Sequence, residues 1–146
     1  MIPDGLLLLA ALGSAVIAVA VFRGRTQTRK RLLLLERAFA GRPSLTPDEF
    51  HQLYFAGSNV PREITTAIPS ILGDVLLFDP ARLQPDDDFL NNLRFIWSGV
   101  DEWADVDIVV QIEEHFGIQI SDSEAASCTR VSDLINLVTV KVTSKA

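Results

Sequence analysis

The sequence predicts an all-α protein in which an N-terminal transmembrane helix precedes a small four-helix bundle. Three observations support this fold class: an uncharged apolar run over residues 5–22, later segments with apolar residues at a spacing of three and four, and capping residues where those segments begin. We therefore expect a transmembrane anchor over residues 1–22, a basic juxtamembrane and helical connector over 23–57, and a helical domain over 58–146.

The N-terminal run 5–22 has the length of a membrane span. As a helix it would reach about 27 Å, which is close to the hydrocarbon thickness of a bilayer. Five basic residues lie within residues 23–31, whereas Asp4 is the only charged side chain before the run. The positive-inside rule then places the N-terminus outside and the remaining chain in the cytoplasm. This predicts a single-pass protein of a bacterial-type inner or plasma membrane.

Two other interpretations of the run stay open. A cleaved signal peptide requires a basic region before the apolar run, and residues 1–5 contain no Lys or Arg. A buried core helix would be shorter and would carry a polar stripe. The anchor also accounts for the basic residues that follow.

Charge is divided unevenly along the chain. Residues 1–31 carry a net charge of +4, so the remaining residues carry −10 of the total of −6. Such an acidic domain is a poor nucleic-acid binder, because phosphate contacts need Lys and Arg, and it suits protein partners with basic surfaces. The single cysteine, Cys128, excludes an internal disulfide and a multi-cysteine zinc site and is typical of a reducing compartment. We expect no metal site.

Two short helices are expected in the connector. Residues 31–40 favour a helix that continues from the membrane or lies along its surface, and Gly41-Arg42-Pro43-Ser44 ends it. Thr46-Pro47-Asp48-Glu49 then has the arrangement of a capping box with proline at the first helical position. This box predicts a helix that ends at Gly57.

The first helix of the bundle is expected over residues 61–78, where Ile64, Ile68 and Leu72 repeat at helical spacing. Pro69 should kink this helix or restart it. Residues 79–100 should form an ordered, packed loop. Within the loop, the three aspartates 86–88 lack the spacing of a calcium site, so a loop-capping role is expected.

Residues 101–120 predict the central helix, with one apolar stripe and one acidic face. The stripe is formed by Val106, Val109, Val110 and Phe116, with Ile112 or Glu113 between them. Asp101 is a good N-cap residue, which places Glu102 in the first turn, and Gly117 is placed to end the helix. A short polar helix over 121–126 and a last helix capped by Thr129 follow, and the β-branched tail 138–143 fits a frayed or an extended end.

The central segment resembles the second helix of acyl carrier proteins. Asp101-Glu102-Trp103 stands in the place of the family's Asp-Ser-Leu start, and Ile112-Glu113-Glu114-His115-Phe116 in the place of its Leu-Glu-Glu-Glu-Phe end. Residues 131–135 resemble the start of that family's final helix. The resemblance covers about residues 60–140 and implies an acyl-carrier-like four-helix bundle that is not an enzyme.

The resemblance implies a 4′-phosphopantetheine arm on the residue at position 102, which here is Glu102. The usual transferase chemistry needs a hydroxyl nucleophile, so we expect the site to be lost and no cofactor to be bound. Glu102 then serves as a favourable first-turn carboxylate or as a permanent anion that partners recognise. The alternative is that Ser98, one helical turn upstream, carries the arm.

The main functional prediction is a membrane-tethered docking or regulatory module that binds basic partner proteins, acyl-handling enzymes among them, without catalytic residues. The expected partner-binding residues belong to the central helix: Asp101, Glu102, Trp103, Asp105, Asp107, Glu113 and Glu114. The alternative function is a working acyl or peptidyl carrier for lipid or secondary-metabolite synthesis with the arm on Ser98.

Overall fold

The computed structural model describes the backbone of residues 4–145 and the side chains of residues 17–145 except 21 and 24. The described residues form six α-helices: α1 (Asp4–Ala38), α2 (Pro47–Phe55), α3 (Arg62–Leu76), α4 (Ala104–Phe116), α5 (Asp122–Ser127) and α6 (Val131–Lys145). Two short 3₁₀ helices, η1 (Pro80–Arg82) and η2 (Arg94–Trp97), lie in the loop between α3 and α4. The predicted all-α fold class is confirmed.

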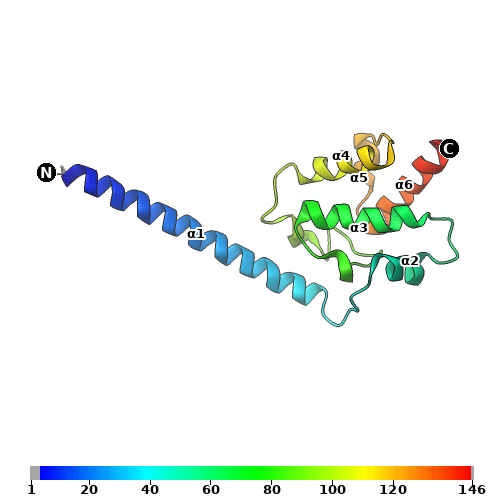
Figure 1. Cartoon of the computed structure of the whole chain (residues 1–146), viewed down its shortest axis with the longest axis horizontal. Helices are drawn as coiled ribbons and strands as arrows, with labels where there is room; N and C mark the ends of the chain where they lie inside the picture. The colour runs from blue at the N-terminus through cyan, green and yellow to red at the C-terminus, as the bar shows by residue number, and fades with distance from the viewer. Residues whose placement is uncertain (1–3, 146) are drawn as a thin grey trace.

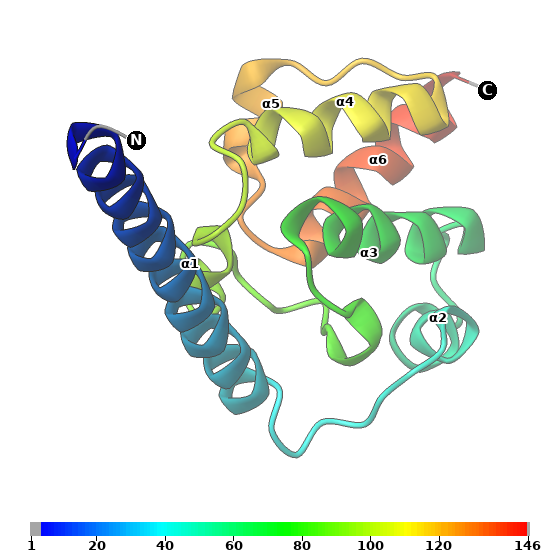
Figure 2. The ribbon, with the colours of Figure 1, turned by 60° about the vertical axis from the view of Figure 1, so that its left-hand side comes forward.

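Helix α3 lies at the centre of the domain, with α4 on one side, α2 on the other and α6 packed behind it (Figures 1 and 2). Its buried face, formed by Ile64, Ile68, Leu72 and Leu76, repeats every four residues and contacts the apolar faces of the helices around it. Pro69 is buried within α3, and the helix continues through it, so the predicted restart is wrong. Ile68 and Ile71, on both sides of Pro69, are buried as well.

Helix α1 runs away from the domain, and only its last turns meet it (Figure 1). With 35 residues it is about 52 Å long. The predicted span over residues 5–22 lies in this helix, and the side chains up to residue 16 lie outside the described ones. In the described part of the chain, no helix is both long and apolar enough to cross a membrane. The predicted transmembrane helix is therefore not found there.

The last turns of α1 belong to the core. Leu35 and Phe39 are buried in the same apolar cluster as the residues of α3, and Glu36 forms an ion pair with Arg82 at 2.7 Å. The predicted capping box at Thr46 is present and starts α2, which adds Phe50 and Phe55 to the cluster. The connector thus contributes buried side chains to the helical domain.

The loop between α3 and α4 is ordered and packed, as predicted. Its apolar side chains Leu83, Leu93 and Ile96 are almost fully buried. The Asp87 carboxylate binds the Arg42 guanidinium through two contacts of 2.7 and 2.9 Å and also accepts hydrogen bonds from the Gln84 amide and the Asn92 side chain. Among the described residues, no cluster of three or more potential ligands could hold a metal ion. Asp87 and Asp88 accept hydrogen bonds from the Gln84 and Leu90 amides and thereby organise the backbone of the loop.

The predicted cap of the last helix is wrong, whereas both C-terminal helices are present. The Asp133 carboxylate, and not the Thr129 hydroxyl, accepts hydrogen bonds from the Thr129 and Arg130 amides at the start of α6. Ser121 and Glu124 form a capping box at the start of α5. Val131, Leu134, Ile135 and Val138 are buried along α6, as their spacing predicts. The tail 138–143 is helical, because Val138 and Thr139 are both buried against the core and continue the same apolar face.

Candidate functional site

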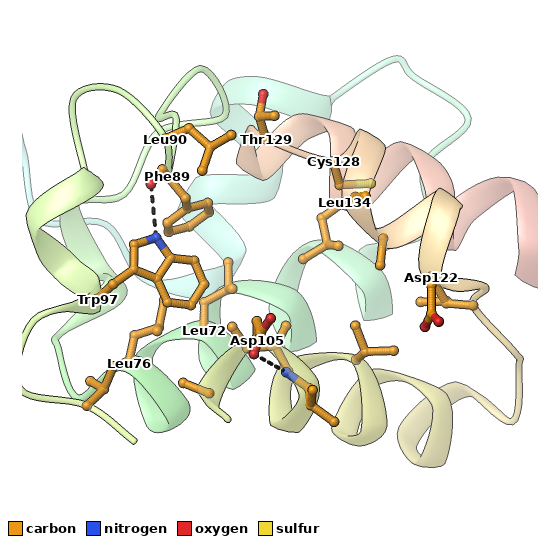
Figure 3. Close-up of a pocket in the computed structure, with 18 of the residues that line it drawn as sticks. Leu72, Leu76, Phe89, Leu90, Trp97, Asp105, Asp122, Cys128, Thr129 and Leu134 are labelled. Atoms are coloured by element: carbon orange, nitrogen blue, oxygen red, sulfur yellow. Dashed lines mark hydrogen bonds between the residues drawn. The ribbon is translucent and has the colours of Figure 1, made fainter. Parts of the chain in front are cut away.

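A pocket of about 960 Å³ opens between α4, α5, the start of α6 and the loop that precedes α4 (Figure 3). Leu72 and Leu76 of α3 form part of its lining, and Leu134 of α6 lines it from the opposite side. Most of the lining is apolar. A cavity of this size and character can accept an apolar chain, and its polar groups lie at the edge.

Two aromatic residues from the loop close one side of the pocket. The Trp97 indole N–H donates a hydrogen bond of 2.9 Å to the Phe89 carbonyl, and the two rings meet edge to face with centroids 6.2 Å apart (Figure 3). The tryptophan therefore has its polar group satisfied while its ring faces the pocket. Its orientation depends on the loop backbone at Phe89.

The N-terminal end of α4 lies at the pocket and begins later than predicted. The helix starts at Ala104 with Trp103 as N-cap, so that Asp101 is not the N-cap and Glu102 is not in the first turn. The Asp101 carboxylate instead accepts a hydrogen bond from the Trp103 amide at 2.9 Å, and its carbonyl accepts one from Ala104. Asp101 thus stabilises a turn that leads into the helix. Glu102 is exposed in this turn.

The predicted apolar stripe of α4 is partly wrong. The buried residues are Ala104, Ile108 and Ile112, whereas Val106 is 47% and Val110 40% exposed. The helix carries apolar residues on both faces, so periodicity alone does not select the inner one. Contact with α3 buries the face of Ile108 and leaves the two valines outside.

An exposed strip therefore runs along the outside of α4. Trp103, which is 63% exposed, shares it with Val106 and Val110 at helical spacing. The acidic residues Asp101, Glu102, Asp105, Asp107 and Glu114 are exposed as well. Glu113 differs from them, because its carboxylate accepts a hydrogen bond of 2.7 Å from the Ile120 amide in the turn after α4. The structure thus places most of the predicted partner-binding residues on one end and one side of a single helix.

Ser98 is exposed directly after η2, and its amide donates to the Phe95 carbonyl at 3.0 Å. Gly99 follows with a φ of +79°, a left-handed turn that favours glycine. The residues on both sides of this turn, Trp97 and Val100, line the pocket. The serine hydroxyl is therefore accessible and lies close along the chain to the pocket wall.

Cys128 also lines the pocket. Burial raises the pKa of its thiol, and the thiol donates a hydrogen bond of 3.5 Å to the Glu124 carbonyl. This environment disfavours the thiolate, so Cys128 is a packing residue of the pocket wall.

The pocket itself was not predicted from the sequence. The signal for it lies in α5, where the small residues Ala125 and Ala126 face the lining residues of α4 and leave space between the helices. The sequence of this segment predicts only a short polar helix.

Comparison with known proteins identifies the fold. Residues 66–138 match the family model described as "Phosphopantetheine attachment site". An acyl carrier protein from Thermosynechococcus vestitus is 30% identical over 80 residues, which cover 55% of this chain and 93% of the relative. The chain belongs to the acyl carrier protein family. Its members are non-enzymatic carriers, which confirms the expected absence of catalysis by this chain.

Two further acyl carrier proteins are similar to part of this chain. The acyl carrier protein of Cyanidium caldarium is 31% identical over 84 residues, covering 58% of this chain and 92% of the relative. The meromycolate extension acyl carrier protein of Mycobacterium leprae is 28% identical over 76 residues, covering 52% and 62% respectively. The family match includes both Ser98 and Glu102, and α1 and α2 lie outside it.

Proposed function

We propose that the protein is a non-catalytic acyl carrier whose pocket between α4, α5 and α6 shelters an acyl chain. The observation that supports this proposal best is the pocket of about 960 Å³ with its mainly apolar lining. Burial of an acyl chain there would remove its methylene groups from water at a gain of about 0.8 kcal/mol for each group. The acidic residues at the edge, Asp101, Glu102 and Asp105, would remain in solvent.

A 4′-phosphopantetheine arm requires a hydroxyl, and the two candidate positions differ in this respect. Glu102 offers a carboxylate, which does not fit the phosphodiester linkage of the family. Ser98 offers an exposed hydroxyl beside two pocket-lining residues. We therefore propose that the arm is attached to Ser98. The thiol at the end of the arm would then form the thioester that carries the acyl group.

The second candidate is a docking module without an arm. It is favoured by the resemblance that sets Glu102 in the place of the family's serine, and by the exposed strip Trp103, Val106 and Val110 between acidic side chains. An apolar strip with a carboxylate rim suits a partner surface in which basic residues surround an apolar depression. Acyl-handling enzymes are the class of partner that this surface fits.

Membrane attachment is part of the same proposal. The uncharged residues 5–22 and the basic residues that follow them support a tether, with the carrier domain in the cytoplasm. A tether would raise the effective concentration of the carrier for enzymes and acyl groups at the membrane. Extraction of the full-length protein at alkaline pH tests this: release into the soluble fraction would contradict it.

Intact-mass measurement after co-expression with a phosphopantetheinyl transferase tests the carrier function. We expect one phosphopantetheine on the wild type, none on Ser98→Ala, and full modification of the control Ser70→Ala, which removes an exposed serine from α3. An unmodified wild type together with a modified Glu102→Ser variant would contradict the arm on Ser98 and favour the docking module.

The docking surface is tested by partner capture with charge-reversed variants. We expect Asp105→Lys with Asp107→Lys to reduce the recovery of partner proteins, because both carboxylates are exposed beside the apolar strip. The matched control is Asp48→Lys with Asp74→Lys, which alters α2 and α3 outside this surface. Equal recovery with both double variants would exclude docking through α4.

A further inference from the structure

Arg31 joins three parts of the molecule that are far apart in the sequence. It lies on α1, and its guanidinium donates hydrogen bonds to the carbonyls of Leu76 and Leu77 at the end of α3 and of Ile96 in η2. The bond to Leu77 is 2.7 Å and the bond to Ile96 is 3.2 Å long. One side chain thus holds α1, α3 and the loop before α4 together.

Two of the acceptors are backbone carbonyls at the C-terminal end of α3. The last carbonyls of a helix have no partner within the helix, and the helix dipole favours a positive charge at this end. Leu77 ends α3 in the left-handed conformation with a φ of +56°, which turns the chain away from the helix axis. A planar guanidinium with several donors can reach such divergent carbonyls, whereas an ammonium group acts as a single point charge.

The guanidinium group of Arg31 is partly buried. Burial lowers the pKa of its guanidinium, and its Nε atom is buried without a hydrogen-bond partner among the described residues. A charge in this place is tolerated only because the carbonyls compensate for lost water. The Arg31 side chain therefore depends on its hydrogen bonds to the carbonyls of Leu76, Leu77 and Ile96.

The η2 contact leads directly to the functional site. Ile96 is followed by Trp97, which lines the pocket, and by Ser98. The Arg31 side chain also approaches the turn at Gly99, where an added Cβ would lie 3.8 Å from Arg31 Cδ. The position of the pocket wall is thus connected to α1 through one residue.

We propose that Arg31 is a positioning residue that couples α1 to the pocket wall at Trp97 and to the loop that presents Ser98. An effect of Arg31 on acyl-chain binding rests on the proposed carrier function, whereas the coupling between α1 and the loop does not. A change in the position of α1 is transmitted through Arg31 to the loop, so that α1 controls the shape of the pocket entrance.

The test compares three variants of the full-length chain by amide hydrogen exchange. Arg31→Met removes the donors, Arg31→Lys keeps the charge with one donor group, and Arg29→Met makes the first change at an exposed arginine of the same helix. In Arg31→Met we expect exchange at the Ile96 and Ser98 amides to rise about tenfold or more, because charged hydrogen bonds hold the loop. Arg31→Lys should lie between Arg31→Met and the wild type, and Arg29→Met should equal the wild type.

Tryptophan fluorescence provides a second readout at the pocket wall. The chain has two tryptophans, so a Trp103→Phe background leaves Trp97 as the reporter. We expect Arg31→Met to shift its emission to longer wavelength and to increase its quenching by acrylamide, and Arg29→Met to change neither. Unaltered exchange and emission in both Arg31 variants would overturn the proposal.

A uniform rise in exchange through α3, α4 and α6 would also overturn it, because Arg31 would then only stabilise the whole fold. If Arg31→Met does not fold, Arg31→Lys decides by the same criteria. Failure of phosphopantetheine transfer to the wild type would contradict the carrier function and leave both of these measurements intact.

Discussion

The two ends of α4 are organised in different ways. At the C-terminal end, Gly117 adopts the left-handed conformation with a φ of +62°, and the Ile118 amide donates to the Glu113 carbonyl. The Glu113 carboxylate accepts from Ile120, and Ile118 and Ile120 are both buried. At the N-terminal end, Glu102 and Trp103 are exposed in a turn that is held mainly by Asp101.

The difference shows which parts of a carrier helix are determined by packing. The C-terminal end is closed by a buried turn, which tolerates few changes. The N-terminal end is exposed, so a residue there can change without affecting the core. Glu102 is therefore compatible with the fold, because its side chain lies in solvent.

The largest expected loss of stability comes from the middle of α4, because this part of the helix packs against the core. Ile112 is fully buried, so Ile112→Ala should lower the free energy of unfolding by about 3 kcal/mol through lost contacts and a cavity. Urea denaturation measures this. Val110→Ala, on the exposed side, should cost less than about 1 kcal/mol. Equal losses would mean that the inner face has been assigned wrongly.

The C-terminal turn should respond to the loss of its glycine. Gly117→Ala places a Cβ in a left-handed conformation, which costs about 1–2 kcal/mol. The nearest atom to that Cβ is Lys145 Nζ, the mobile end of a long side chain, which can move aside. Gly117→Asn should recover part of the loss, since asparagine tolerates this conformation. Thermal unfolding that is unchanged in both variants would contradict a packed turn.

The N-terminal turn should be less sensitive. Asp101→Ala removes the acceptor of the Trp103 amide and should cost about 0.5–1 kcal/mol. Glu102→Ala should change the free energy of unfolding by less than about 0.5 kcal/mol, because Glu102 is exposed. A loss at Glu102 as large as that at Gly117 would remove the distinction between the two ends.

The smallest effect concerns the capping box after the C-terminal turn. The Lys141 ammonium and the Ser121 amide, both bonded to the Glu124 carboxylate, lower the pKa of Glu124. The stabilisation from this carboxylate is thus present above the pKa of an unfolded glutamate and is lost as the pH falls through the lower folded value. NMR titration should show the low pKa, and Lys141→Met should raise it. A midpoint that Lys141→Met leaves in place would exclude the ion pair as its main cause.

Sequence patterns predicted the elements that rely on local rules. The capping box at Thr46, the glycine at 117 and the apolar face of α6 all depend on short-range spacing. The start and inner face of α4 depend on its neighbours. Apolar residues on both sides of the helix left two possible inner faces, and only contact with α3 selects between them.

The residues of the candidate site stay a prediction, and the shape of the pocket was not predicted. Resemblance to acyl carrier proteins pointed to Glu102 and Ser98, and the exposed face of α4 contains most of the expected partner-binding residues. The pocket requires three helices and a loop to be placed together, and the contacts of Arg31 join residues 45, 46 and 65 positions apart. Local periodicity contains no information about separations of this length.

The buried position of Leu35 and Phe39 has a consequence for how the chain folds. The region that matches the family begins at residue 66, whereas the apolar cluster begins at Leu35. The apolar core therefore includes residues that precede the segment matched by the family. A fragment cut at the family boundary would expose the apolar surface that Phe39 covers at Phe78, so we expect it to associate or to refold only partly.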